Sequence, residues 1–356
     1  MTQNPFKFLA PFEKEDRDQF FGRDREIDEL YQAVHASNLT LLYGRSGIGK
    51  TSLVNCGLAN RFDDTDWLPI WVRRCDDLNR SLRGEIAKRL SPDADDLIAD
   101  PGERIRELFA INRRPIYLIL DQFEELFIFG SRLEQERFAA TLAELLRTGP
   151  SCKVLIVIRE ELLSELAILE KALPSLFDNR LRIEPMNYRN LARVIVGMAR
   201  FGRIRIDDPA TTIPKIIENL RRNRKGVDLI DLQIYWDRLL REATALPRAL
   251  NADRITFDSA LVDRVGKFEN VLPDFIDAQL TAIERSLAAR GVRRPEGIPF
   301  EILFAMLTGD GARRAMDVGE IMRTLPKKNV TLTSTDIRYC LEELVRVRLV
   351  RPQTPE

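Results

Sequence analysis

Short apolar runs alternate with segments of helical periodicity between about residues 24 and 185. The runs are rich in Val, Ile and Leu, as expected of strands that are buried on both faces. This alternation is typical of an α/β fold with a parallel sheet that is covered by helices on both sides. The expected strands are LTLLY (39–43), LPIWVR (68–73), IYLILD (116–121), KVLIVIR (153–159) and RLRIE (180–184).

The strand pattern stops after Pro185, and helical spacing continues over 188–201 and 227–243. Further helical segments follow from about residue 270. In the last of them Thr333 and Asp336 resemble a capping box, and the helix gives way to a strand-like RLVRP. The pattern predicts a helical domain and then a winged-helix domain. The expected divisions are a lead-in (1–22), the sheet domain (23–186), the helical domain (187–268) and the winged-helix domain (269–356).

Composition describes a folded chain of two or three domains, because 44% of its 356 residues are hydrophobic and 31% are charged. Basic and acidic residues both total 55, which argues against a general nucleic-acid binder. The four cysteines contain no CxxC pair and only one histidine is present, so neither a zinc site nor a disulfide framework is expected. No apolar run approaches the ~20 residues that span a bilayer. We expect a cytoplasmic protein.

The motif GRSGIGKT directly follows the expected strand 39–43 and opens the next expected helix. Glycines at this spacing let backbone N–H groups surround phosphate oxygens, and the helix dipole adds to the attraction. Lys50 is expected to reach the β- and γ-phosphates, and Thr51 to bind Mg²⁺. The alternative is a chance glycine loop. The motif predicts that ATP or ADP is held by Gly44, Arg45, Ser46, Gly47, Ile48, Gly49, Lys50, Thr51 and Ser52.

An acidic residue at the end of a neighbouring strand is needed to hold hydrated Mg²⁺, and Asp121 ends the expected strand 116–121. Glu124 and Glu125 follow within the same motif. Either of them is suited to polarise the attacking water as a general base, and Glu124 is preferred. The alternative is that one or both only place negative charge in the first turn of a helix.

Arg159 ends the next expected strand. Ligands bind at the carboxyl ends of the strands in parallel α/β sheets, so Arg159 is expected to sense the γ-phosphate. The alternative is a surface ion pair with Glu160 or Glu161.

Five segments together resemble the STAND class of P-loop NTPases, in the group with a DQFEELF-type Walker B motif that is related to the NACHT and apoptotic-type ATPases. The segments are FFGRDREIDEL (20–30), the phosphate loop, DQFEELF (121–127), IVIRE (156–160) and RIEPM (182–186). The resemblance extends over roughly residues 12–350, and this order of motifs is more specific than the phosphate loop alone.

The resemblance also implies a base site, in which Phe21, Gly22 and Arg23 border the adenine and ribose and Pro185 closes over the base. For Phe21 the alternative is plain core packing. In apoptotic-type members a winged-helix histidine locks the bound diphosphate, whereas the only histidine here, His35, precedes the phosphate loop. Arg313 or Arg314 is a candidate to hold the diphosphate in place of that histidine, although the preferred interpretation is that both belong to a solvated basic loop.

The function implied by the resemblance is a signal-transducing ATPase switch with slow, regulatory hydrolysis. Related proteins control oligomerisation or effector activation, many of them in bacterial antiviral defence or programmed cell death. Typical members carry an effector domain before the ATPase or a repeat array after the winged helix. We therefore expect self-association on activation, and a sensor or effector in a partner chain or in a region outside this sequence.

Two other functions compete with the switch. An ATP-dependent DNA-binding initiator or regulator would use the winged helix, and strongly salt-dependent DNA binding would distinguish it. The zero net charge counts against nucleic acid as a partner. A metabolic P-loop kinase would need a lid and an acceptor site within the sheet domain, whereas the remaining length of this chain is helical.

Overall fold

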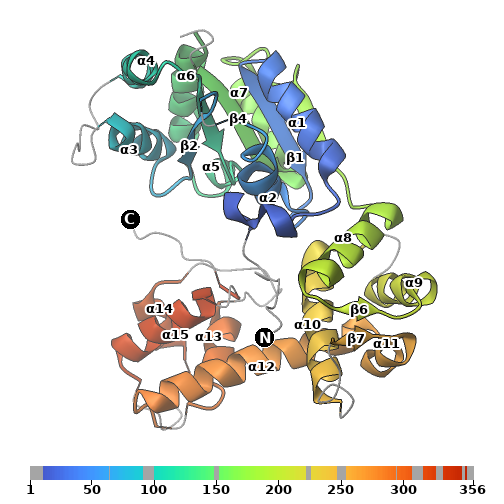
Figure 1. Cartoon of the computed structure of the whole chain (residues 1–356). Helices are drawn as coiled ribbons and strands as arrows, with labels where there is room; N and C mark the ends of the chain where they lie inside the picture. Colours follow the sequence, from blue (N-terminus) through green and yellow to red (C-terminus); the bar gives the residue numbers. More distant parts are fainter. Residues whose placement is uncertain are drawn as a thin grey trace.

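The computed structural model describes residues 11–63, 65–90, 100–147, 152–221, 226–246, 254–293, 295–306, 316–325, 332–346 and 349–350. They form a sheet region (11–184), a central helical region (186–267) and a C-terminal helical region (268–350), as Figure 1 shows. Within these residues no helix combines the length and the apolar character that crossing a membrane requires.

The sheet has five parallel strands in the order β2-β3-β4-β1-β5, and each of them matches a strand expected from the apolar runs. The α/β prediction is therefore confirmed. Strand β4 lies between β1 and β3, and Gly44 at the end of β1 pairs in register with Arg159 at the end of β4. The bounds are β1 Leu39–Gly44, β2 Leu68–Val72, β3 Ile116–Leu120, β4 Cys152–Arg159 and β5 Arg180–Ile183.

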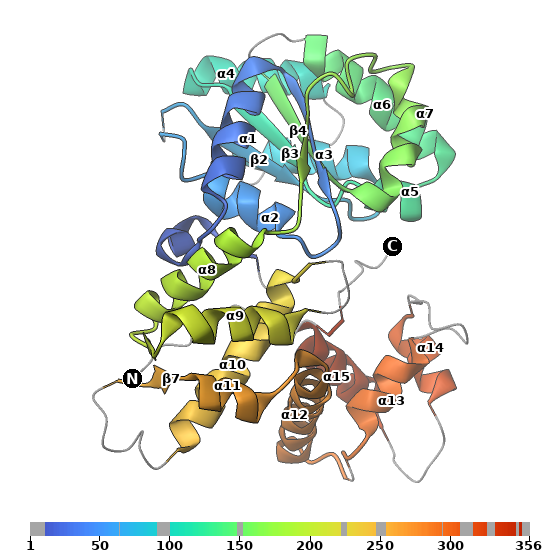
Figure 2. The ribbon, with the colours of Figure 1, turned by 90° about the vertical axis from the view of Figure 1, so that its right-hand side faces the viewer.

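Helices cover both faces of the sheet (Figures 1 and 2). Successive strand residues belong to different cores, because side chains alternate between the faces: Leu118 packs in one core and Ile119 in the other. The first core contains α3 Leu78–Leu90, α4 Pro101–Asn112 and α6 Arg132–Arg147, and the second contains α1 Asp24–Ala36 and the π-helical turns η2 Leu53–Leu58. Shorter elements at the strand ends are η1 Lys14–Gln19, α2 Lys50–Ser52, α5 Glu125–Ile128, η4 Glu160–Leu166 and α7 Ala167–Glu170.

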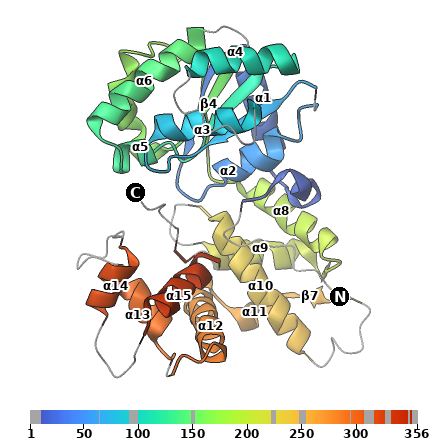
Figure 3. The same ribbon diagram turned by 90° about the vertical axis from the view of Figure 1, so that its left-hand side faces the viewer.

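The central helical region packs around Tyr235 and Trp236, both fully buried. Figures 2 and 3 show α8 next to the sheet region, with α9 and α11 farther from it. Two strands of two residues each form a parallel pair here, which the sequence did not predict because so short a segment has no readable alternation. The elements are α8 Tyr188–Phe201, β6 Arg205–Ile206, α9 Pro209–Leu220, α10 Leu229–Ala245, β7 Thr256–Phe257 and α11 Ser259–Val265.

The C-terminal helical region consists of α12 Phe268–Ala289, α13 Ile298–Ala305, α14 Val318–Thr324 and α15 Ser334–Arg346. Helix α12 joins two cores, because Val271 packs with the central region and Ile283 with the C-terminal one. The capping box is confirmed: the Thr333 N–H donates to Asp336 Oδ2 at 2.9 Å, and the Asp336 N–H donates to Thr333 Oγ1 at 3.1 Å. The Thr333 hydroxyl also donates to Asp336 Oδ2 at 2.6 Å, and this bond together with that from the Thr333 N–H holds the pKa of Asp336 below its usual value.

The winged-helix assignment and the domain boundaries stay predictions. The strand-like segment 348–352 lies largely outside the described residues, as do Arg313 and Arg314.

Candidate functional site

The phosphate-loop motif connects β1 to α2, as the sequence predicts. Strand β1 ends at Gly44 and α2 begins at Lys50. Gly47 and Gly49 have φ values of +77° and +94°, a region that other residues rarely adopt. A Cβ atom on Gly44 would lie 2.7 Å from the carbonyl oxygen of Ile183. The tight loop therefore requires glycine at all three positions.

The other loop residues face different surroundings. Ile48 is buried in the core beneath the loop. Arg45 is exposed and pairs with Glu160 at 3.3 Å, and the Oγ of Ser52 accepts the N–H of Phe12 at 3.1 Å. Ser46 is exposed. Arg45 and Ser46 thus leave the loop interior to backbone groups and to Lys50.

The Lys50 ammonium is held inside the loop. Its Nζ donates to the carbonyl oxygens of Gly44 at 2.8 Å and Arg45 at 2.9 Å. Burial lowers the pKa of Lys50, while nearby carboxylates, Glu124 foremost, raise it. The positive charge is therefore placed where a phosphate chain in the loop would meet it.

Asp121 lies directly after β3, and its side chain is only 2% exposed. The Thr51 hydroxyl donates to Asp121 Oδ1 at 3.0 Å, so the two expected metal ligands are together. Hydroxyl and carboxylate oxygens are the donors that Mg²⁺ prefers, and this pair fits that ion. A third residue, Arg73, also donates to Asp121 Oδ2, from Nε at 3.1 Å and from Nη2. Sequence reasoning missed Arg73, although its place at the end of the expected strand LPIWVR (68–73) was the signal.

Glu124 and Arg159 form an ion pair at the same edge of the sheet. Arg159 Nε lies 2.8 Å from Glu124 Oε1, and the Arg159 N–H donates to Glu124 Oε2 at 3.3 Å. Glu160 instead pairs with Arg182 and Arg45, which lower its pKa. Glu125 begins α5 and is partly buried. Both carboxylate oxygens of Glu124 thus contact the strand-end arginine.

Arg23, expected beside the adenine and ribose, is buried and donates hydrogen bonds to three separate segments. Its guanidinium donates to the carbonyl oxygens of Glu184 at 2.9 Å and Ile48 at 3.3 Å, and to Glu26 Oε1 at 2.5 Å. It therefore ties the phosphate loop to the chain that leaves β5. Gly22 has a φ of +79°, and a Cβ there would lie 2.9 Å from Val194 in α8.

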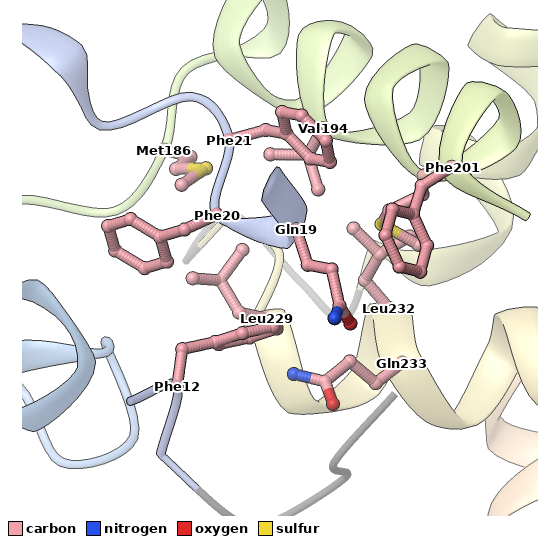
Figure 4. Close-up of a pocket in the computed structure, with 11 residues that line it drawn as sticks. Phe12, Gln19, Phe20, Phe21, Met186, Val194, Phe201, Leu229, Leu232 and Gln233 are labelled. Atoms are coloured by element: carbon pink, nitrogen blue, oxygen red, sulfur yellow. The ribbon is translucent and has the colours of Figure 1, made fainter. Parts of the chain in front are cut away.

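An apolar cavity lies where the N-terminal segment meets the central helical region. Its volume is about 50 Å³, and Phe21 and Met186 line it, whereas Pro185 instead contacts Gly226. Its polar groups are the amides of Gln19 and Gln233, which Figure 4 shows extending into the space between the aromatic rings. Gln233 is 8% exposed, and its Oε1 has no hydrogen-bond partner among the described residues. The other lining residues are Phe12, Phe20, Val194, Met198, Phe201, Leu229 and Leu232.

The cavity and the phosphate loop are connected through the start of α10. A Cβ on Gly49 would lie 3.6 Å from Leu229, which also lines the cavity, and one on Gly47 would lie 3.6 Å from Ile230. The central helical region therefore closes over the loop as well as over the cavity. Sequence reasoning missed Gln19 and Gln233, since no motif marks either residue.

Solved structures with a similar fold include a Walker-type ATPase and origin-recognition proteins. The ORC2 protein of Aeropyrum pernix in ADPNP–ADP complexes has a TM-score of 0.54 and 14% identity, over 98% of this chain and 90% of that chain. Its ADP form has a TM-score of 0.51 and 14% identity, over 97% and 89%. The Walker-type ATPase PABY2304 of Pyrococcus abyssi has a TM-score of 0.50 and 18% identity, over 95% and 92%. These likenesses show the fold alone.

The sequence comparisons identify the family more specifically. No curated protein sequence gives a significant match. The family model described as novel STAND NTPase 1 matches residues 5–249, which include the phosphate loop, Asp121, Glu124 and Arg159. The matched segment is more than half of the chain, and it contains the whole sheet region from residue 11 onward together with α8, α9 and α10. The chain therefore belongs to the novel STAND NTPase 1 family and is a P-loop NTPase of the STAND class.

Proposed function

We propose that this NTPase is a switch whose bound nucleotide, ATP or ADP with Mg²⁺, sets the position of the helical regions relative to the sheet region. The observation that carries the proposal is the contact of the phosphate loop with α10, in which Gly47 and Gly49 face Ile230 and Leu229. A nucleotide in the loop would contact both the sheet region and the central helical region. ATP and ADP can therefore favour different positions of these two regions, as a switch requires.

The phosphate chain is the best-supported part of the proposal. Lys50 exchanges its bonds to the loop carbonyl oxygens for bonds to the β- and γ-phosphates. Thr51 and Asp121 would hold Mg²⁺, which would supply positive charge that offsets the negative charge of the phosphates.

Glu124 is the proposed general base and Arg159 the proposed γ-phosphate sensor. In the structure both carboxylate oxygens of Glu124 contact Arg159. A water molecule must therefore compete with Arg159 for the base. Turning of the Arg159 side chain towards a γ-phosphate would free Oε1 of Glu124, while Oε2 keeps the Arg159 backbone N–H, and this requirement supports slow, regulated hydrolysis.

The adenine base is placed in the apolar cavity beside the loop, with Phe21 against it. Leu229 borders both spaces, so one nucleotide can occupy the loop and the cavity together. The unpartnered Oε1 of Gln233 is an acceptor for the exocyclic amine of adenine. The solved ORC2 structures carry ADP or ADPNP, which supports an adenine nucleotide.

Gly22, Arg23 and Pro185 act indirectly in this proposal. They hold the phosphate loop, α8 and the segment before α10 in contact.

The proposed consequence of switching is self-association, with a sensor or effector supplied by a partner chain, in a role such as antiviral defence or programmed cell death. Light scattering with ADP and with an ATP analogue, in the presence of the partner, measures it. A mass that is the same in both states would contradict this part of the proposal.

Lys50→Ala tests the nucleotide site itself. We expect ATP affinity in calorimetry to fall at least about thirtyfold, because the variant removes the charge aimed at the phosphates. Lys88→Ala is the matched control, since Lys88 is exposed and pairs with Glu85 on α3. Unchanged ATP affinity in Lys50→Ala would remove the phosphate-site assignment.

A further inference from the structure

Arg73 places a positive charge on the carboxylate that is expected to serve the metal. It follows β2, the neighbour of β3, so its side chain starts beside Asp121. Nε and Nη2 of Arg73 both donate to Oδ2 of Asp121, and Thr51 donates to the same carboxylate. A buried carboxylate without a partner is costly, so Arg73 compensates a charge that is 2% exposed.

The two consecutive arginines after β2 differ in how firmly they are held. Arg74 is 12% exposed and pairs with Glu134, which is 7% exposed and also accepts the N–H of Leu78. Arg73 is 50% exposed. Arg74 is therefore an anchored structural residue, whereas the Arg73 side chain can leave for solvent at little cost in burial.

We infer that Arg73 is a displaceable counter-cation that neutralises Asp121 when the metal is absent and competes with Mg²⁺ for that carboxylate. Two cations on one buried carboxylate repel each other, so metal binding weakens or breaks the Arg73 contact. Without metal, Arg73 offsets the negative charge of Asp121 and lets phosphates approach. The inference rests on the proposed nucleotide site and adds that this site accepts and releases nucleotide without its metal.

The test is ADP affinity by calorimetry, measured in EDTA and in saturating Mg²⁺ and expressed as the ratio of the two Kd values. We expect Arg73→Gln to weaken ADP binding in EDTA and leave it unweakened in Mg²⁺, so that the ratio rises about tenfold. Arg73→Lys keeps the charge, and its ratio should lie between wild type and Arg73→Gln. Arg89→Gln is the matched control, because Arg89 contacts the carbonyl oxygen of Pro69 at the other end of β2.

The Asp121→Asn variant tests whether the effect of Arg73 depends on the Asp121 carboxylate. Because that carboxylate is absent in Asp121→Asn, adding Arg73→Gln to it should leave the ratio of the two Kd values unchanged. For wild type alone, which needs no variant to fold, we expect ADP affinity in EDTA within about tenfold of that in Mg²⁺. Equal ratios in wild type and Arg73→Gln, or no ADP binding by wild type in EDTA, would overturn the inference. If the proposed nucleotide site itself were wrong, wild type would not bind ADP with Mg²⁺ either, and this result distinguishes that case from failure of the inference about Arg73.

Discussion

Glu124 and Glu125 are adjacent in the chain but have different surroundings. Glu124 has a side chain 6% exposed in contact with Arg159, whereas Glu125 begins α5. We expect Glu124→Gln to keep ATP binding and to slow hydrolysis by about 100-fold or more, because it removes the proposed base. Single-turnover phosphate release measures the rate. Glu125→Gln is the control, and if it alone stopped hydrolysis, the assignment would be reversed.

Arg159 offers a test that separates ATP from ADP. Its guanidinium contacts Glu124 at the end of β4, where only a triphosphate would present a further charge. We expect Arg159→Ala to weaken ATP binding about tenfold and to leave ADP affinity within about twofold. Calorimetry with both nucleotides measures this, with Arg182→Ala as the strand-end control. Equal losses for ATP and ADP would indicate a purely structural ion pair.

The position of Gln233 leads to a prediction about how the adenine base is recognised. If its Oε1 accepts the adenine amine, purine riboside triphosphate, which lacks that amine, should bind wild type about tenfold more weakly than ATP. In Gln233→Met the two nucleotides should bind alike. Competition binding gives all four affinities, and Gln135→Met is a control on α6, outside the cavity. The same penalty in wild type and variant would place the amine elsewhere.

The residues of the site divide by whether a local sequence signal marks them. Lys50, Thr51 and Asp121 were predictable, because a loop motif marks the first two and an acidic strand end marks the third. Arg73 and Gln233 were not, since their importance depends on which strands and helices become neighbours. A residue without a motif gains a role only through tertiary contacts.

Helix α8 is the element that fits the N-terminal segment to the central helical region. A Cβ on Gly197 would lie 2.6 Å from the Phe21 ring. We expect Gly197→Ala to lower the free energy of unfolding by about 1–3 kcal/mol and also to weaken ATP binding, because Phe21 lines the cavity. Thermal unfolding and calorimetry measure these effects. Gly319→Ala in α14 is the control, where the nearest atom would be 3.2 Å away, and equal effects in both variants would contradict the role of this contact.

The elements themselves were largely predictable. Each apolar run became a strand of the parallel sheet, because the inner strands β1, β3 and β4 are buried on both faces and need little beyond length and hydrophobicity to be recognised. The short pair β6 and β7 and the π-helical turns of η2 were not predictable. Both depend on backbone bonds that the surrounding packing selects, and neither leaves a periodic pattern.

At the scale of the whole molecule, the sequence predicts a sheet region followed by helical regions but not how they meet. The contact of Leu229 and Ile230 with the phosphate loop joins residues that are far apart in the chain. That contact turns a nucleotide site into a proposed switch, because a ligand there touches both regions. A coupling of a few kcal/mol would suffice to shift the arrangement.

The most direct measurement is the distance between the sheet and central helical regions in each nucleotide state. Spin labels are attached at Glu136 on α6 and Arg205 on β6, which are both exposed. The background carries Cys75→Ser, because Cys75 is the exposed cysteine and would also be labelled. Pulsed electron paramagnetic resonance then measures the distance between the labels. We expect different distance distributions with ADP and with a Mg²⁺-bound ATP analogue, and no difference in Lys50→Ala. Identical distributions for both nucleotides in the wild-type background, with saturation shown by calorimetry, would contradict the nucleotide switch.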